Sequence, residues 1–408
     1  MTTNLSRPPR ICYVLSHFHP IASGAERQAL AQGAELVRRG HSVRVVTQSI
    51  PGQPRDDSID GVLIHRWVRP IRVGPMFGLS FVFGVIRALR RLRPEYDLIH
   101  THQGLWEAIA TGTGQALGLL GGAPTLIQPA SSGYYGEAEE LSRTRGFDRL
   151  RRLILRNTEF AAISADIEAQ WLALGVPWTR MSRMSSGVDS EHFRPGPPDP
   201  AIEATLPPRT GPRVVFTGRL HPQKNLDLIL RAWPTVVART GATLILVGDG
   251  PDRDRLTALS QSLGIADHVH FAGSVPDPSL FLRSARAFVL PSVAEGMSNS
   301  LLEAMSTGLA CVASKIGGNT DLLGGDDPTG ILVESNEPEA WSSAVVDLLV
   351  RPDAAERLGR AARRRVESTY SMESVVTRYQ MLYESIIKRR SAALENPQNR
   401  YSRQPRSG

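Results

Sequence analysis

The fold of this chain is indicated most clearly by residues 288–318, which read FVLPSVAEGMSNSLLEAMSTGLACVASKIGG. The apolar run FVLPS predicts a buried strand that ends where a polar turn begins. Ser298 and Asn299 are preferred helix caps, an apolar stripe follows them, and Gly308 is typical of a helix end. The segment therefore predicts a strand, a turn and a helix in succession.

Two carboxylates flank this turn, with Glu295 on the loop and Glu303 in the first turn of the expected helix. A helix start exposes unpaired N–H groups and a partial positive charge, which favour an anion such as phosphate. Carboxylates beside a phosphate would repel it unless they face sugar hydroxyls, from which they accept hydrogen bonds. The alternative is that Glu303 supports the helix dipole and Glu295 is a solvated loop residue.

Residues 211–233 repeat the pattern in the sequence GPRVVFTGRLHPQKNLDLILRAW. A β-branched strand leads through Gly218 to a loop with Arg219 and Lys224, and Asn225 is expected to cap the next helix. Two cations at the C-terminal end of a strand suit a pyrophosphate, although they could also be ordinary surface charge. Because the chain has only three lysines among its 47 basic residues, the lysine favours a site that needs a compact ammonium.

The motif TGRLHPQKN and the E-x7-E pattern in EGMSNSLLE together resemble the retaining, nucleoside-diphosphate-sugar-dependent glycosyltransferases of the GT-B fold, the family 4 group. The resemblance covers about residues 10–390 and includes SGAERQALAQGAELVRRGHSVRVVT and YDLIHTH. It implies an α/β protein with two Rossmann-like lobes that face each other across a cleft. It also implies a C-terminal helix that crosses back onto the N-terminal lobe.

Strand and helix signals alternate in both halves of the 408-residue chain, which is typical of parallel sheets wrapped by helices. We expect residues 1–193 to form an acceptor-binding lobe and residues 213–370 to form the nucleotide-sugar-binding lobe. Residues 194–212 contain seven prolines and predict a stiff linker. Apolar residues at helical spacing predict the crossing helix over residues 371–390, and the polar residues 391–408 are expected to be a disordered tail.

The resemblance implies that the second lobe stabilises the charge that develops on a departing nucleoside diphosphate. Arg219 and Lys224, with the helix start at Asn299 and Ser300, would do so without a metal or any other cofactor. The anomeric configuration would be retained, with a donor phosphate oxygen taking the proton of the acceptor.

Both glutamates would hold hydroxyl groups and would not form a hydrolase acid–base pair. Glu303 would bind the ribose diol, and Glu295 would bind the transferred sugar and favour a cationic anomeric carbon. The other residues expected around the sugar are Gly296, Met297 and Ser298. Since a ribose diol is common to all nucleotides, the donor base stays open, with UDP-linked sugars as the commonest case in the family.

Two positions of the first lobe are expected to reach the donor. Gly24 opens the first helix, and its backbone can approach the diphosphate or the sugar closely. His102 ends the strand in YDLIHTH, and the resemblance implies that it contacts the donor sugar with His100 as support. This chain has Ser23 where the family usually has glycine and Ser186 where it usually has asparagine, so it departs from the family pattern at both positions.

Three patterns suggest other chemistry. GTGQALG at residues 112–118 is similar to a dinucleotide fingerprint, but its spacing is wrong and it predicts helix packing. Asp252 and Asp254 could suggest a metal-dependent transferase, although a helix start favours dipole and cap chemistry. H-x-H pairs beside strands would suit zinc, but no convincing further ligands accompany them. These pairs are His17 and His19, His100 and His102, and His268 and His270.

Composition narrows the class of protein. The chain is 41% hydrophobic and 21% charged, as in a globular protein, and no stretch approaches the ~20 apolar residues of a membrane span. The start MTTNLSRPPR lacks the apolar core of a signal peptide, so a cytoplasmic location is expected. Cys12 and Cys311 both fall in expected strands, which argues against a disulfide framework.

The acceptor is indicated only by charge, since the net charge is +7 and arginines cluster with apolar residues at 74–94 and 143–156. Basic amphipathic helices can lie in an anionic membrane interface, where a lipid-linked saccharide is presented. The alternative is a helix packed on the sheet with a solvated charged face. Nucleic acid is not expected as a partner, because aromatic residues do not alternate with the basic ones.

The sequence therefore predicts a metal-independent, retaining glycosyltransferase that moves a hexose-type sugar from a nucleoside-diphosphate sugar to a lipid-linked, polysaccharide or other hydroxyl acceptor. We expect it to make peripheral contact with the inner face of the cytoplasmic membrane. Two other classes stay open at this point, a non-catalytic nucleotide-sugar-binding protein and a metal-dependent hydrolase.

Overall fold

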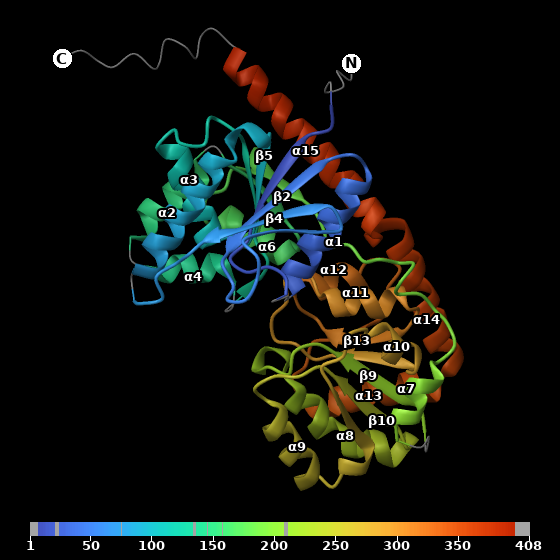
Figure 1. Cartoon of the computed structure of the whole chain (residues 1–408). Coiled ribbons are helices and arrows are strands. Elements are labelled where there is room, and N and C mark those ends of the chain that lie inside the picture. The colour runs from blue at the N-terminus through green and yellow to red at the C-terminus, as the bar shows by residue number, and fades with distance from the viewer. Residues whose placement is uncertain are drawn as a thin grey trace, which may run out of the picture.

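Two α/β lobes, joined along one side by a long C-terminal helix, make up the computed structural model (Figure 1). The structure describes residues 7–20, 24–74, 76–133, 136–144, 146–156, 158–207 and 211–395. Each lobe has a mostly parallel sheet covered by helices, so the α/β fold class expected from the sequence is confirmed.

The first lobe contains an eight-stranded sheet in the order β3-β4-β2-β1-β5-β6-β7-β8. Its strands are β1 (Arg10–Val14), β2 (Ser42–Gln48), β3 (Asp56–Ile59), β4 (Val62–Val68), β5 (Leu98–His102), β6 (Thr125–Gln128), β7 (Thr158–Ala162) and β8 (Met181–Arg183). Neighbouring strands pair in parallel except β3 with β4. Strands β1 and β5 are buried on both faces, so residues 11–14 are apolar and even the polar His100, Thr101 and His102 of β5 are buried.

Helices cover both faces of this sheet. They are α1 (Gly24–Arg38), α2 (Met76–Arg91), α3 (Trp106–Ala116), α4 (Glu137–Arg143), α5 (Phe147–Leu155) and α6 (Ala165–Ala173). Since side chains alternate across a strand, Tyr13 of β1 joins the core beneath α1, whereas Cys12 and Val14 join the core beneath α2.

The second lobe has a six-stranded parallel sheet in the order β11-β10-β9-β12-β13-β14. Its strands are β9 (Arg213–Thr217), β10 (Thr243–Val247), β11 (Val269–Gly273), β12 (Ala287–Leu290), β13 (Ala310–Ser314) and β14 (Ile331–Val333). Its helices are α8 (Leu226–Thr240), α9 (Arg253–Ser262), α10 (Ser279–Arg283), α11 (Asn299–Ser306), α12 (Gly317–Leu323), α13 (Pro338–Val350) and α14 (Pro352–Arg365). The expected strand, turn and helix of residues 288–318 correspond to β12, the following loop and α11.

The linker at residues 194–212 includes a short helix that the proline count did not predict. Helix α7 (Pro200–Thr205) has a proline at its first position, and the side chain of Asp199 accepts hydrogen bonds from its first N–H groups. Arg213, which begins β9, pairs with Glu203 of α7 at 2.6 Å. The connection is therefore partly packed against the second lobe.

Helix α15 (Met372–Glu395) leaves the second lobe and lies along the first (Figure 1). Val376, Tyr379 and Tyr383 are buried in the core that α1 and the first sheet also form. The helix continues through residue 395, so the expectation of a disordered tail is wrong for residues 391–395, and residues 396–408 lie outside the described part of the chain. Ala392, Ala393 and Leu394 have high helix propensity, which favours continuation of the helix past residue 390.

Both cysteines are free and buried, and they belong to sheets of different lobes. Within the described ranges, no helix combines the length and the apolar character needed to span a bilayer.

We expect Tyr383→Ala to lower the free energy of unfolding by about 3–5 kcal/mol, because it empties a fully buried aromatic site between α15 and the first sheet. Met381→Ala on the same helix is the matched control, since that side chain is 66% exposed. Urea unfolding of both variants measures the difference. Equal losses would show that α15 is not stabilised through this face.

Candidate functional site

A cleft of about 760 Å³ lies between the lobes, at the C-terminal edges of both sheets. Its walls include all of the residues expected from the sequence to contact the donor except His102. These residues are Gly24, Arg219, Lys224, Glu295, Gly296, Met297, Ser298, Asn299, Ser300 and Glu303. His102, which was expected beside them, is not in the cleft wall.

The loop between β12 and α11 contacts the first lobe directly. A Cβ atom at Gly296 would overlap the carbonyl oxygen of Ala130, so only glycine permits this approach. The hydroxyl of Ser132 donates to the carbonyl oxygen of Glu295 at 3.0 Å. The loop that carries the first glutamate is thus also a contact between the lobes.

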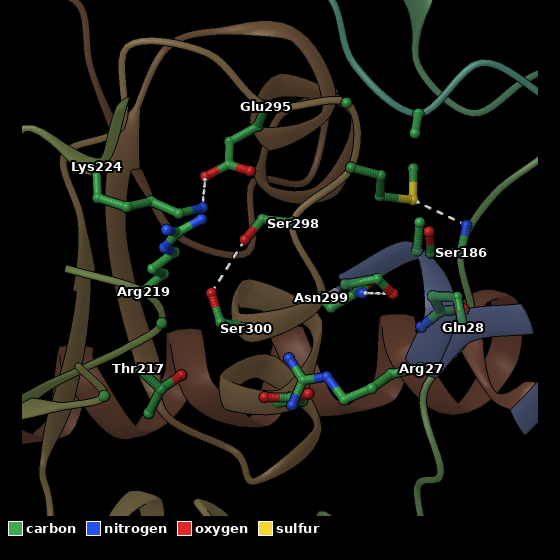
Figure 2. Close-up of a pocket in the computed structure, with 18 of the residues that line it drawn as sticks. Arg27, Gln28, Ser186, Thr217, Arg219, Lys224, Glu295, Ser298, Asn299 and Ser300 are labelled. Atoms are coloured by element: carbon green, nitrogen blue, oxygen red, sulfur yellow. Dashed lines mark hydrogen bonds and ion pairs between the residues drawn. The ribbon is translucent and has the colours of Figure 1, made fainter. Parts of the chain in front are cut away.

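The starts of α1 and α11 meet in the cleft (Figure 2). Asn299 Nδ2 donates to the carbonyl oxygen of Gly24 at 2.9 Å, and a Cβ on that glycine would lie 3.0 Å from the same nitrogen. The Ser298 hydroxyl caps α11 by accepting from the N–H of Leu301 at 3.3 Å. The N–H groups of Asn299 and Ser300 have no intrahelical acceptor, so this edge of the cleft favours an anion.

Lys224 and Glu295 form an ion pair in the cleft wall, with Nζ 2.5 Å from Oε1 (Figure 2). The lysine side chain is 18% exposed and the carboxylate 9%, so each offsets the cost of burying the other. An ammonium has three donors, and this pair uses one of them. Arg219 is exposed beside the pair and forms no ion pair with a described residue.

The loop before α8 differs from the expectation. Residues 222–224 form a 3₁₀ turn, and the His221 ring accepts from the N–H of Gln223 at 3.2 Å. Asn225 does not cap α8 with its side chain, because it adopts a left-handed conformation with φ 49° and ψ 42°. Asparagine tolerates this conformation, which turns the chain from the cationic loop into the helix.

Glu303 lies in the second turn of α11, not in its first turn, because the helix begins at Asn299. It is 8% exposed, and burial raises its pKa to about 7, although the charge of Arg27 acts in the opposite direction. Figure 2 shows the Arg27 side chain extending from α1 across the cleft towards α11. The arginine was not singled out from the sequence, since a charge on an amphipathic helix gives no signal of its own.

His102 faces the core beneath α15 and not the cleft. It is 1% exposed, its ring lies 4.1 Å from that of His100 and 4.5 Å from that of Tyr13, and burial lowers its pKa to about 3. His100 shares this face, as expected from strand alternation, and contacts the Tyr383 hydroxyl at 2.8 Å. The structure therefore does not place His102 against a ligand in the cleft.

Gln103 and Gln128 line the cleft in its place. Gln103 has a φ of 154°, which is unusual for a residue with a side chain. Gln128 ends β6, is 8% exposed, and accepts a hydrogen bond of 2.6 Å from the Tyr379 hydroxyl of α15. An amide at the end of the apolar run TLIQ was the available sequence signal for this position.

The patterns that suggested other chemistry have structural roles. Gly112 lies inside α3, where a Cβ would press on the backbone of Leu153 in α5, so the GTGQALG segment packs against a helix as expected. Asp252 pairs with Arg255 at 3.0 Å and makes no side-chain cap bond. Among the described residues no group of three or more histidine, cysteine, aspartate or glutamate side chains could hold a metal ion.

Two family models match the chain. One is described as Glycosyltransferase Family 4 and matches residues 22–192, and the other is described as Glycosyl transferases group 1 and matches residues 211–351. The chain is 29% identical over 391 residues to D-inositol 3-phosphate glycosyltransferase 2 of Catenulispora acidiphila, covering 86% of this chain and 89% of the relative. It is 28% identical to a GDP-mannose-dependent alpha-(1-6)-phosphatidylinositol monomannoside mannosyltransferase of Mycobacterium tuberculosis, covering 90% and 96%.

Solved structures share the arrangement of both lobes. Sucrose-phosphate synthase from Thermosynechococcus elongatus superposes with a TM-score of 0.77 at 22% identity, over 93% of this chain and all of that one. Anabaena HepE in complex with UDP and glucose superposes with a TM-score of 0.74 at 17% identity, over 92% of this chain and 100% of that one. At these identities the likeness concerns the fold.

Glu303→Gln should stabilise the protein increasingly as the pH rises from 5 to 8. A carboxyl whose pKa is raised from 4.5 to about 7 binds its proton more tightly in the folded state, so the wild type loses stability as that proton leaves. The advantage of the variant should reach about 1–3 kcal/mol at pH 8, since one pKa unit corresponds to about 1.4 kcal/mol. Urea unfolding across this pH range measures it.

The exposed Glu337→Gln provides the control for the loss of one carboxylate elsewhere in the chain. A pH-independent difference for Glu303→Gln would mean that this carboxylate is already charged throughout the range.

Proposed function

Because the chain belongs to the family 4 glycosyltransferases of the GT-B fold, we propose that it transfers a hexose-type sugar from a nucleoside-diphosphate sugar to a hydroxyl acceptor. The observation that carries this proposal is the meeting of two helix starts at Asn299 and Gly24, beside the cations of the β9–α8 loop. The helix starts favour an anion, and the buried carboxylates favour a diol. A nucleotide sugar is one ligand that has both groups.

In this proposal the diphosphate lies between the N–H groups that begin α11 and the side chains of Arg219 and Lys224. As the bond from the anomeric carbon to the phosphate breaks, negative charge grows on the leaving oxygen, and these donors stabilise it. The N–H groups are fixed by the helix, so they need no reorganisation during the reaction. In this proposal the negative charge on the leaving diphosphate is stabilised without a metal ion or other cofactor.

Glu303 would accept hydrogen bonds from the ribose diol, and Glu295 from hydroxyls of the transferred sugar. Glu295 is already bound to the lysine ammonium through Oε1, which supports a binding role over a nucleophilic one. The acceptor hydroxyl oxygen would attack the anomeric carbon on the face from which the diphosphate leaves, and its proton would pass to a donor phosphate oxygen. This sequence retains the anomeric configuration.

For the donor base and for the acceptor we propose several candidates. Uridine is the first choice from the resemblance, and guanosine is the second because one relative is named as GDP-mannose-dependent. Inositol 3-phosphate and a phosphatidylinositol monomannoside, which appear in the names of relatives, are reasonable acceptors to test beside polysaccharides and other lipid-linked sugars. The geometry and the comparisons give no support to a metal-dependent hydrolase or a non-catalytic binding protein.

We expect replacement of Arg219 and Lys224 by glutamine together to lower kcat by about 10²–10³ or more, because removing one donor to a developing oxyanion typically costs that much. The effect should fall mainly on kcat, since the charge grows in the transition state. The exposed pair Arg357 and Arg360 of α14, replaced in the same way, is the charge-matched control. Unchanged turnover in the first double variant would refute the assignment of the diphosphate site.

Radiolabelled UDP- and GDP-sugars, offered with the acceptor panel, test the function itself. Transfer should proceed at the same rate with and without excess EDTA, because fixed cations and helix N–H groups take the place of a divalent metal. A tenfold or greater loss with the chelator, restored by Mg²⁺ or Mn²⁺, would contradict the metal-independent proposal. Binding of nucleotide with neither transfer nor donor hydrolysis would contradict catalysis.

A further inference from the structure

Two segments of the first lobe, residues 74–94 and 143–156, combine arginine with apolar residues in the sequence. In the structure the two segments differ in how their apolar side chains are packed. In α5, Ile154 is fully buried, and the partly buried Phe147 and Leu150 pack against the same core, while Arg149 and Arg152 are exposed. Helix α5 is therefore an ordinary packed helix with a solvated basic face. Helix α2 is different.

Helix α2 presents apolar side chains on both of its faces. Phe81 and Val85 are fully buried in the core between α2 and the sheet. On the opposite face, Met76 is 52% exposed, Leu79 is 75% exposed and Phe83 is 67% exposed. Their spacing of three and four residues aligns them in one ridge along the outside of the helix.

The ridge continues into basic residues. Arg87 and Arg90 follow Phe83 at intervals of four and three residues, so they extend the same stripe, and both are exposed. The loop before the helix adds exposed Ile71 and Val73, at 46% and 67% exposure. Apolar residues thus lie at one end of the stripe and cations at the other.

Charge is one-sided over this region. Residues 69–93 contain six arginines and no aspartate or glutamate, in a chain whose net charge is only +7. Arg93 donates hydrogen bonds to the backbone carbonyl oxygens of Tyr96 and Gly121. The Arg91 guanidinium lies over the Trp67 ring, 4.5 Å from its centre. The exposed arginines that remain are Arg69, Arg72, Arg87 and Arg90.

The ridge begins at the edge of the sheet that borders the cleft. Strand β4 runs parallel to β2, and its C-terminal end leads through residues 69–74 into α2. The C-terminal ends of β5 and β6 open on the cleft through Gln103 and Gln128. Figure 1 shows α2 on the flank of the first lobe opposite to α15, where the second lobe does not cover it.

We propose that the ridge of α2, with the loop at residues 69–74, docks the protein on an anionic lipid bilayer. The apolar side chains enter the boundary between head groups and acyl chains, and the arginines contact lipid phosphates. A bilayer is the occupant that fits best, because a single convex helix with long cations needs a deformable, negatively charged surface and not a complementary pocket. The proposal concerns this surface alone and holds whichever donor the cleft binds.

Co-sedimentation of the full chain with vesicles tests the proposal. Wild-type protein should bind phosphatidylcholine vesicles that contain about one third phosphatidylglycerol, and should bind pure phosphatidylcholine at least roughly tenfold more weakly. The double variant Leu79→Ser, Phe83→Ser and the double variant Arg87→Gln, Arg90→Gln should each weaken binding to the anionic vesicles by roughly tenfold or more.

Matched controls change equally exposed residues elsewhere. Trp178→Ser with Met381→Ser removes two apolar side chains that are 68% and 66% exposed, and Arg357→Gln with Arg360→Gln removes two exposed charges. Neither control should change vesicle binding by more than about twofold. Thermal unfolding confirms that all variants are folded, and transfer to a water-soluble acceptor should stay at the wild-type rate in all of them.

Three results would overturn the proposal. They are equal binding to neutral and anionic vesicles, equal weakening by the controls, and concentration-dependent dimerisation of wild type that the Leu79 and Phe83 replacements abolish. The last result would identify the ridge as a contact between copies of the chain. Vesicle binding without any sugar transfer would leave the docking surface intact and contradict only the proposed function.

Discussion

The arrangement of the site depends on one close approach, in which the loop before α11 meets the first lobe. Gly296 has no side chain because the carbonyl oxygen of Ala130 occupies the space, and Asn299 binds the backbone of Gly24. Backbone contact at these two points brings two helix starts, which both favour anions, to the same edge of the cleft. A side chain at Gly296 would press on the backbone of Ala130 and separate the lobes, and with them the groups that are proposed to share one diphosphate.

Charge compensation follows from the same closeness. Glu295 and Glu303 are mostly buried in the cleft wall, where isolated charges are costly, so cations lie close to them. Lys224 binds Glu295 directly, and Arg27 reaches from the first lobe towards the buried Glu303. A nucleotide sugar supplies both an anion and hydroxyl groups, so it can engage the cations and the carboxylates of these pairs at once. The mixed charge of the cleft suits a ligand that carries both phosphate and hydroxyl groups.

The sequence predicted the parts of the site that depend on one segment at a time. Strand ends, glycine turns and the cap at Ser298 are local, and parallel strands bring their C-terminal ends to a common edge. It did not predict which strand-end side chain reaches the cleft, because that depends on the side chains packed around each strand end. His102 is 1% exposed and packs against Tyr13 and His100, whereas its neighbour Gln128 binds Tyr379 of α15 and still lines the cleft. The left-handed conformation of Asn225 was not predicted either, because it depends on the path of the residues on both sides.

Helix α15 links these observations, because it touches both the core of the first lobe and the cleft wall. Tyr379 is buried and donates to the Gln128 side chain, so the helix that leaves the second lobe fixes an amide in the first. The path from α14 to α15 is interrupted by a π-helical turn at Val366–Tyr370 and by Ser371, which has a ψ of 145°. The direction of α15 relative to α14 is therefore fixed at this interruption, which backbone hydrogen bonds between Val188 and residues Tyr370 and Met372 hold in place. The position of Gln128 relative to the second lobe is therefore set by this short segment as much as by the cleft itself.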